Sequence, residues 1–219
     1  MDADFTLYDY WRSSACYRVR IALNLKGLRY AHRPVHLLKN GGEQHGARHR
    51  ALNPQEAVPV LMHGEHVVRQ SLAIMEYLEE VDSAAPRLLP VGALDRARVR
   101  SLALLIACDV HPINNLRVMQ YLEREFGIEQ DAREHWMRHW MSAGLHSFET
   151  LLANDAGTGL FCHGDSPSLA DACLIPQVYN ANRFGVDLTS LPTIQRINEQ
   201  CLTLPAFDAA RPENQPDAG

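Results

Sequence analysis

Metal-binding and disulfide patterns are missing from this chain of 219 residues. Its five cysteines are odd in number, widely spaced and never arranged as CxxC, so we expect reduced thiols, four of them packed in the core. Its eleven histidines form no HExxH sequence, because Glu134 precedes the pair His135 and His139 instead of standing between them. The sequence therefore predicts neither a metal site nor a disulfide framework.

Long apolar runs and clusters of basic residues are also missing. The formal net charge is only −5, and Lys and Arg are scattered along the chain, which argues against a nucleic-acid partner. No apolar stretch is long enough to span a bilayer, and the start, MDADFTLYDYW, lacks the basic and apolar regions of a secretion signal. We therefore expect a cytoplasmic protein with a small-molecule or protein partner and no contact with a membrane.

The first eighty or so residues indicate a mixed α/β domain. Residues 5–10 predict a strand, and residues 19–23 place apolar side chains on one face of a helix that ends at Gly27. Residues 30–35 predict a second strand, followed by an exposed loop over residues 39–46. Two further apolar runs flank His63-Gly64 and predict a hairpin, after which Ser71 caps a helix. The order βαβ-ββα is typical of a thioredoxin-like domain.

The rest of the chain predicts helices. Residues 83–94, with Pro86 and Pro90, interrupt the periodicity and are interpreted as a linker. Helices are expected over Arg96–Glu125 with a kink at Pro112, over Gln130–Leu152, and from Leu169 to about Phe184, where Ser168 and Asp171 form a capping box. The last ten residues, rich in Pro and Asp, predict a loose tail. The expected division is 1–82 for the thioredoxin-like domain, 83–94 for the linker and 95–219 for an all-helical domain.

Several motifs resemble those of the zeta-class glutathione transferases over nearly the whole chain. These motifs are Ser13–Leu23, Ala51–Pro54, Val58-Pro59, Gln70–Ile74 and Ser168–Asp171. Three other segments resemble the bacterial maleylacetoacetate and maleylpyruvate isomerases in particular: Asp109–Val118, Pro176–Val178 and Arg183–Leu188. The resemblance implies a glutathione-transferase fold, glutathione as cofactor, and a homodimer.

The implied activity is cis–trans isomerisation of a maleyl diacid, with maleylacetoacetate converted to fumarylacetoacetate in aromatic amino-acid catabolism. Maleylpyruvate isomerase remains an alternative, although some maleylpyruvate isomerases carry Arg where this chain has Leu116, which favours maleylacetoacetate. The opening motif also departs from the family, since Ser13-Ser14-Ala15-Cys16 stands where Ser-Ser-Cys-Ser is usual. The chain therefore carries its thiol one position later.

The start of the first helix is suited to holding a thiolate. Ser14 offers a hydroxyl donor there, and the backbone amides and helix dipole favour negative charge. The dipeptide Ser13-Ser14 alone would more often be a simple helix cap than a functional site. The resemblance implies that four consecutive residues contact glutathione: Ser13, Ser14, Ala15 and Cys16.

The resemblance assigns further contacts with glutathione to both halves of the chain. It implies a cis bond between Val58 and Pro59 that presents the Val58 backbone, and a γ-glutamyl carboxylate site at Gln70 and Ser71. The resemblance also places His111 and Asn115 near glutathione, and Gln44 is a weaker assignment. His111 by itself would more often be a packed helix histidine than a ligand.

Three arginines are implied to line the substrate pocket: Arg12, Arg117 and Arg183. A guanidinium grips a carboxylate with two hydrogen bonds and stabilises a developing enolate, so these residues suit a dicarboxylate substrate. The catalytic residues expected are Ser14 and Arg12. In most proteins a single such arginine would be a solvated surface charge.

Two other function classes remain open. Cys16 near a helix start would suit a thiol transferase that forms a mixed disulfide with glutathione, although its position two residues past Ser14 argues against direct nucleophilic duty. A general glutathione transferase is a further enzyme alternative. A non-catalytic binding module is the other, because a fold does not fix a function. Retention of Ser14 and of the arginines argues against such a module.

Overall fold

The computed structural model describes residues 5–82 and 86–218, which belong to two compact units. One unit runs up to Leu88 and also includes residues 203–219, while the other spans Leu89–Leu202. This division moves the C-terminal segment, which was expected in the helical domain, into the first unit. Of the expected linker, residues 83–85 lie outside the described residues.

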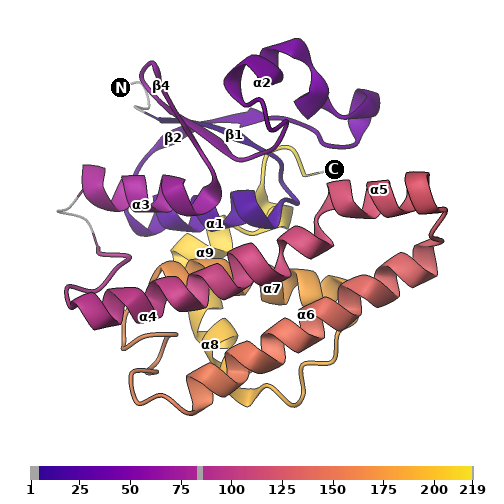
Figure 1. The fold of residues 1–219 in the computed structure, drawn as a ribbon. Helices are drawn as coiled ribbons and strands as arrows, with labels where there is room; N and C mark the ends of the chain where they lie inside the picture. The colour runs from indigo at the N-terminus through magenta and orange to yellow at the C-terminus, as the bar shows by residue number, and fades with distance from the viewer. Residues whose placement is uncertain (1–4, 83–85, 219) are drawn as a thin grey trace. The chain divides into compact units, whose positions relative to one another are not determined.

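The first unit is built on a mixed sheet of order β2-β1-β3-β4 (Figure 1). Parallel pairing joins β1 to β2, whereas β1–β3 and β3–β4 are antiparallel, as the βαβ-ββα pattern predicted. Along β1 the side chains alternate between buried and half-buried, so its inner face joins the core. The elements of this unit are β1 Phe5–Asp9, α1 Ser14–Leu25, β2 Tyr30–Pro34, β3 Val60–His63, β4 His66–Arg69 and α3 Ser71–Val81.

The connection between β2 and β3 is more ordered than predicted. It forms two 3₁₀ turns, Lys39–Gly41 and Glu43–His45, and the short helix α2, Ala47–Leu52. Gly42 has φ +97, and a Cβ atom there would lie 2.6 Å from the Gln44 amide nitrogen. Glycine at this position lets the Gln44 side chain fold back over the turn.

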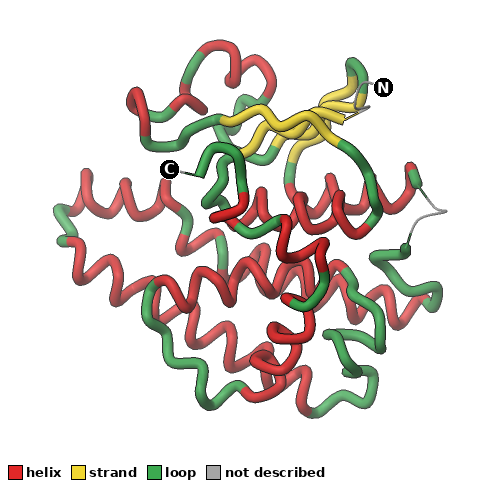
Figure 2. The backbone as a smooth tube through the Cα atoms, turned by 180° about the vertical axis from the view of Figure 1, so that it is seen from behind, coloured by secondary structure: helices red, strands yellow, loops and turns green. Residues whose placement is uncertain are grey.

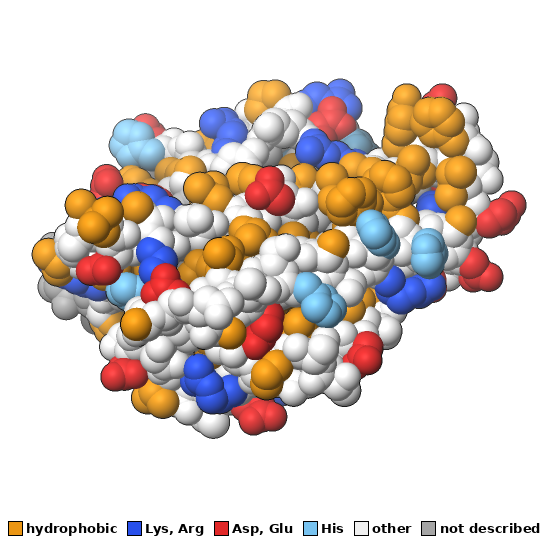
Figure 3. Space-filling view, turned by 60° about the horizontal axis from the view of Figure 1, so that its bottom comes forward, with side chains coloured by type: hydrophobic (Ala, Val, Ile, Leu, Met, Phe, Trp, Pro, Cys, Tyr) orange, Lys and Arg blue, Asp and Glu red, His pale blue; other side chains and the backbone are white. Residues whose placement is uncertain are grey.

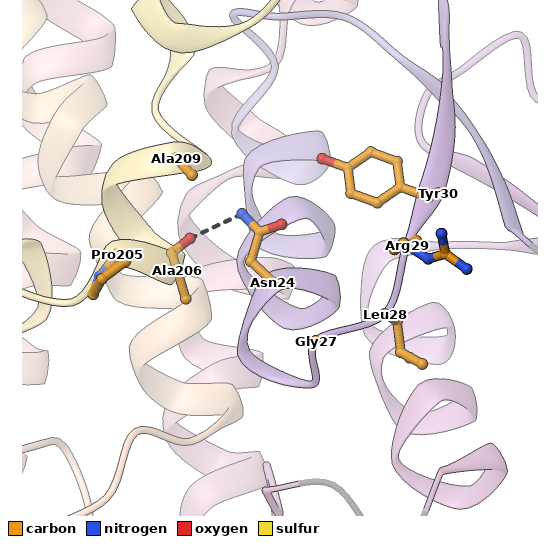
Figure 4. Close-up of a pocket in the computed structure, with 8 residues that line it drawn as sticks. All are labelled: Asn24, Gly27, Leu28, Arg29, Tyr30, Pro205, Ala206 and Ala209. Atoms are coloured by element: carbon orange, nitrogen blue, oxygen red, sulfur yellow. Dashed lines mark hydrogen bonds between the residues drawn. The ribbon is translucent and has the colours of Figure 1, made fainter. Parts of the chain in front are cut away.

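The C-terminal segment is folded, so the expectation of a loose tail is wrong. It forms α9, Pro205–Ala209, and a 3₁₀ turn, Pro212–Asn214. Figure 4 shows Asn24 of α1 facing α9, where its Nδ2 donates to Ala206 O at 3.0 Å. Gln215 is only 8% exposed and donates to the carbonyls of Ala209 and Arg211 at 2.9 and 2.7 Å. These side-chain to backbone bonds hold a Pro- and Asp-rich sequence that has little intrinsic helix propensity.

The second unit is helical, as Figure 2 shows. Pro112 does more than kink the first predicted helix: α4 continues into a π-helical segment, a 3₁₀ turn follows, and a new helix starts after Asn115. The capping box of Ser168 and Asp171 is confirmed, and α8 was not predicted. The helices are α4 Ala93–Leu104, α5 Leu116–Phe126, α6 Gln130–Ala153, α7 Leu169–Arg183 and α8 Pro192–Leu202.

The surface agrees with a chain that lacks strong charge clusters. On the face shown in Figure 3, acidic and basic side chains are interspersed.

Within the described ranges no helix is both long enough and apolar enough to cross a membrane, and no three His, Cys, Asp or Glu side chains gather as a metal site. On α6, Met137 is buried, whereas Trp136 and Trp140 are each 38% exposed.

Candidate functional site

Three segments leave the sheet of the first unit at one edge. Tyr8 near the end of β1 pairs with Val60 at the start of β3, and Val60 pairs with Arg69 at the end of β4. The segments after β1, before β3 and after β4 therefore meet at this edge. They carry the glutathione contacts expected in this unit at Ser13, Ser14, Val58, Gln70 and Ser71.

Helices α1 and α3 both begin at this edge and pack beside each other (Figure 1). Their first turns expose backbone N–H groups and the positive ends of the helix dipoles. The edge can therefore bind two separate negative groups, one at each helix start.

The hydroxyl groups of Ser13 and Ser14 differ in their hydrogen bonds at the start of α1. Ser13 is the N-cap, and its Oγ accepts from the Cys16 N–H at 3.3 Å. Ser14 is half-buried, and among the described residues no group forms a hydrogen bond with its hydroxyl. The Ser14 hydroxyl is thus the one left to donate to a thiolate, with Ala15 next to it on the half-buried face.

Cys16 lies in the first turn of α1. Its side chain has no exposed surface, and its backbone N–H already donates to Ser13. Burial raises the pKa of the Cys16 thiol well above the usual value, and the nearby Asp9 carboxylate raises it further. A buried, protonated thiol is a poor nucleophile, which counts against the thiol-transferase alternative.

The bond between Val58 and Pro59 is cis, as expected from the resemblance. Val58 precedes β3 and lies outside the paired strands. Its backbone N–H and C=O are therefore not part of the sheet ladder, and the position suits antiparallel pairing with an extended peptide ligand.

The turn into α3 is held by buried and strained groups. Gln70 has φ +70, which is uncommon for a residue other than glycine and is typical of functional sites, and its Nε2 donates to Gln55 Oε1 at 2.7 Å. Ser71 is 7% exposed, and its Oγ accepts from Arg18 Nη1 at 3.2 Å. The Arg18 guanidinium, itself almost fully buried, adds positive charge to the start of α3.

Gln44 is buried in the turn Glu43–His45. Its Nε2 contacts Leu37 O at 3.5 Å and His45 Nε2 at 3.0 Å, while its Oε1 has no hydrogen-bond partner among the described residues. His45 and Arg50 both pair with Glu56, which fixes the outer side of this turn. An unpaired buried amide oxygen is uncommon and marks a position where a partner is expected.

In the second unit, His111 and Asn115 lie together at the break between α4 and α5. His111 Nε2 is 3.4 Å from Asn115 Nδ2, and Asn115 caps α5 by accepting from the Arg117 N–H at 3.2 Å. Arg117 is exposed. The α5 start thus combines a helix dipole, an amide and a guanidinium, a set suited to an anion.

The other two candidate arginines lie elsewhere in the fold. Arg12 is in the turn before α1, where its guanidinium lies 4.9 Å from the Trp11 ring centre and its Nη2 donates to the Tyr10 hydroxyl at 3.4 Å. Arg183 is the exposed last residue of α7 and stacks on Phe184 at 4.7 Å. Such stacking orients the plane of a guanidinium group.

Sequence reasoning missed Arg18 and Arg20, which are both nearly or fully buried in α1. Their signal was present: two charges stand inside the apolar run Cys16–Leu23, where a helix face was predicted to be core. Buried charges are paired in folded proteins. The partners could not be named, because they lie on other elements, from the nearby β1 strand to the start of α3 and the segment after α9.

A hollow of about 650 Å³ lies at the opposite end of α1 from Ser14, beside β2 and α9 (Figure 4). Tyr30 and Asn24 line it together with small apolar residues of α9. Burial raises the pKa of Tyr30 to about 12, with a further contribution from Asp9, so its hydroxyl stays protonated. The expected site residues do not line this hollow.

Comparison with known proteins gives one consistent family. Residues 7–86 match the family model for the glutathione S-transferase N-terminal domain. The chain is 53% identical over 212 residues to a probable maleylacetoacetate isomerase of Vibrio cholerae, covering 97% of each chain.

Solved structures agree. A holo maleylpyruvate isomerase, described as a bacterial zeta-class glutathione S-transferase, matches with a TM-score of 0.94 at 47% identity, over 98% of this chain and 100% of its own. A maleylacetoacetate isomerase from Methylobacterium extorquens AM1, solved with malonate and glutathione, matches with a TM-score of 0.93 at 44% identity, over 98% and 99%. With the two helix starts and the cis-proline loop at one sheet edge, these matches establish that the chain belongs to the zeta-class glutathione transferases, the family of the maleylacetoacetate and maleylpyruvate isomerases.

Proposed function

We propose that this chain is a glutathione-dependent cis–trans isomerase of maleyl diacids that converts maleylacetoacetate to fumarylacetoacetate. The observation that carries the proposal is the common edge of the first sheet, which holds the starts of α1 and α3 and the cis Val58-Pro59 bond. Glutathione has a thiol, an extended backbone and a γ-glutamyl carboxylate, and each has a counterpart at this edge. Gln44 Oε1 and the Ser14 hydroxyl, both without partners among the described residues, fit the same ligand.

Each residue then has a separate task. Ser14 donates to the thiolate sulfur at the start of α1, Val58 pairs its backbone with the cysteinyl unit, and Ser71 with the first N–H groups of α3 receives the γ-glutamyl carboxylate. Bound glutathione supplies a thiolate that adds reversibly to the cis double bond, allows rotation about the resulting single bond, and leaves as the trans bond forms.

The arginines serve the substrate. Arg12 lies two residues before Ser14, and this proximity supports a role for its guanidinium in stabilising the negative charge that develops on the enolate oxygen during addition. Arg117 and Arg183 would hold the carboxylates by charge-assisted hydrogen bonds. Substrates without two carboxylates should therefore react poorly.

Maleylpyruvate is the second candidate substrate, favoured by the close structural match to a maleylpyruvate isomerase. Leu116, an uncharged residue at the start of α5, favours maleylacetoacetate. The deciding experiment compares kcat/KM for both substrates with glutathione present and absent. Failure to isomerise either diacid in the presence of glutathione would refute the proposal.

We also propose a cytoplasmic homodimer. The five cysteines all lie in the described residues as free thiols, which fits a reducing compartment. Support for the dimer comes from the family, and light scattering coupled to gel filtration tests it: a mass near twice the chain mass of 24.6 kDa is expected, and a monomer would contradict it.

A further inference from the structure

The turn that joins β1 to α1, residues 10–13, carries Arg12 and Ser13 and leads directly to Ser14; we call it the active-site turn. Inside it, the Ser13 N–H donates to Tyr10 O at 2.9 Å. The backbone of Trp11, at its centre, is held on both sides. Its carbonyl accepts from Arg20 Nη2 at 2.9 Å, and its N–H donates to Asp217 Oδ2 at 3.2 Å.

The second of these contacts comes from the far end of the chain. Asp217 is 206 positions from Trp11 and belongs to the C-terminal segment that follows α9. Figure 1 shows this yellow segment passing from α9 toward the sheet. The Asp217 side chain is only 13% exposed, so its carboxylate is largely withdrawn from water and available to the turn.

The other Asp217 oxygen lies near the buried charges under the turn. Oδ1 lies 3.5 Å from His32 Nε2, and the same nitrogen lies 3.3 Å from Asp9 Oδ2. Asp9 in turn takes two bonds from Arg20 Nη1, at 2.8 and 2.9 Å. Arg20 also donates from Nε to Ala210 O at 3.0 Å, which fixes the start of the segment that carries Asp217.

We propose that Asp217 is a positioning residue for the active-site turn: it fixes the Trp11 N–H so that Arg12 and Ser14 keep their reactive orientation. The proposal rests on the isomerase function insofar as it gives Arg12 and Ser14 their roles. A turn of four residues between a strand and a helix has several accessible conformations, and two opposed backbone bonds at its centre select one of them. Errors of about 1 Å in such placement cost large factors in rate.

The test replaces Asp217 by Ala and measures two independent quantities. The first is steady-state kinetics: kcat for the maleyl diacid should fall about tenfold, the size expected for loss of a hydrogen bond to a charged acceptor, while KM for glutathione changes less than about twofold. The second is tryptophan fluorescence in a Trp136→Phe, Trp140→Phe background, where Trp11 is the remaining tryptophan of the three. Its acrylamide quenching should increase when Asp217 is lost.

Two matched variants separate positioning from general stability. Asp217→Asn keeps an oxygen that can accept from Trp11 and should restore kcat to within about threefold of the original. Glu213→Ala removes an exposed carboxylate of the same segment, which pairs with Arg211 at 2.5 Å, and should leave kcat and quenching unchanged.

The outcomes also separate this inference from the proposed function. Unchanged kcat and unchanged Trp11 quenching in Asp217→Ala would overturn the positioning role. Equal losses in Glu213→Ala and Asp217→Ala would overturn it as well, because they would show a general effect of the segment. If the parent chain isomerises no maleyl diacid but quenching still responds to Asp217 alone, the proposed function fails and the positioning role stands.

Discussion

Replacement of Arg20 by Met should destabilise the first unit strongly, because it leaves a buried carboxylate without its cation. Arg20 and Asp9 both have no exposed surface, and Arg20 donates at 2.8 to 3.0 Å to both Asp9 oxygens and to two backbone carbonyls. Removing one partner of such a pair costs about 3–5 kcal/mol, since the remaining charge stays buried. We expect a loss of this size in the free energy of unfolding, measured with urea at pH 7.

The pH dependence gives a sharper test. Burial alone would raise the pKa of Asp9, but His32 and Arg20 outweigh it and hold the pKa below the ordinary 3.8. In the parent chain the ionised Asp9 therefore contributes stability above its ordinary pKa, and this is lost as the pH falls through the lowered value. Loss of Arg20 removes two of the contributions that lower the pKa of Asp9, so this pKa rises in the variant. As the pH falls, protonation of Asp9 then reduces the cost of burying its unpaired charge. The stability gap between variant and parent should shrink between pH 7 and pH 4.

Two further variants serve as controls for the stability measurement on Arg20→Met. Arg124→Met breaks an exposed pair with Glu125 and should change the free energy of unfolding by less than about 0.5 kcal/mol. Asp9→Asn combined with Arg20→Met should cost less than the two single changes added together, because the pair is coupled. A gap under about 1 kcal/mol at pH 7, or one that does not vary with pH, would refute this account of Asp9.

Three further predictions concern the site. Ser14→Ala should lower kcat about tenfold or more while weakening glutathione binding less, because its hydrogen bond is aimed at the thiolate; equal loss in calorimetric affinity and in turnover would contradict this. Single Ala replacements of the substrate arginines should each reduce kcat/KM for a maleyl diacid by about tenfold or more, and near-normal kinetics in all three purified, folded variants would point to uncharged electrophiles instead. These arginines are Arg12, Arg117 and Arg183. Iodoacetamide at neutral pH should label the exposed Cys108 and spare Cys16, as read by peptide mass spectrometry; alkylation of Cys16 with parallel loss of activity would revive the thiol-transferase alternative.

Most of the strands and longer helices were predictable because they carry a local signal, although α8 was missed. Period-two and period-3.6 patterns identified the strands and long helices, and the capping box at Ser168 located the start of α7 within one residue. Short elements were missed where the local signal is weak. Helix α2 has six residues and no side-chain cap, and α9 has five. Helices this short are stabilised by tertiary contacts and not by intrinsic helix propensity.

The candidate glutathione site was named from motifs, and the strand register supplied the geometry. The local sequence around Val58 and Gln70 does not indicate that they lie near Ser14. The antiparallel pairing of Tyr8 with Val60 and of Val60 with Arg69 brings them to the same edge of the sheet. The structure also bears on Cys16, which the sequence left open as a minority candidate for a reactive thiol. Its side chain is fully buried, and burial and the nearby Asp9 raise the pKa of its thiol, which argues against that alternative.

By itself, the sequence determined the fold class, the family, and the residue types that can hold a thiolate and a diacid, because periodicity, caps and motifs are encoded over short stretches of chain. The tertiary structure decided which of those residues share an edge and what holds them there. The hydrogen bonds between Arg18 and Ser71 and between Asp217 and Trp11 join residues that are 53 and 206 positions apart. Contacts at such separations depend on how the whole chain packs, so no local pattern in the sequence specifies them.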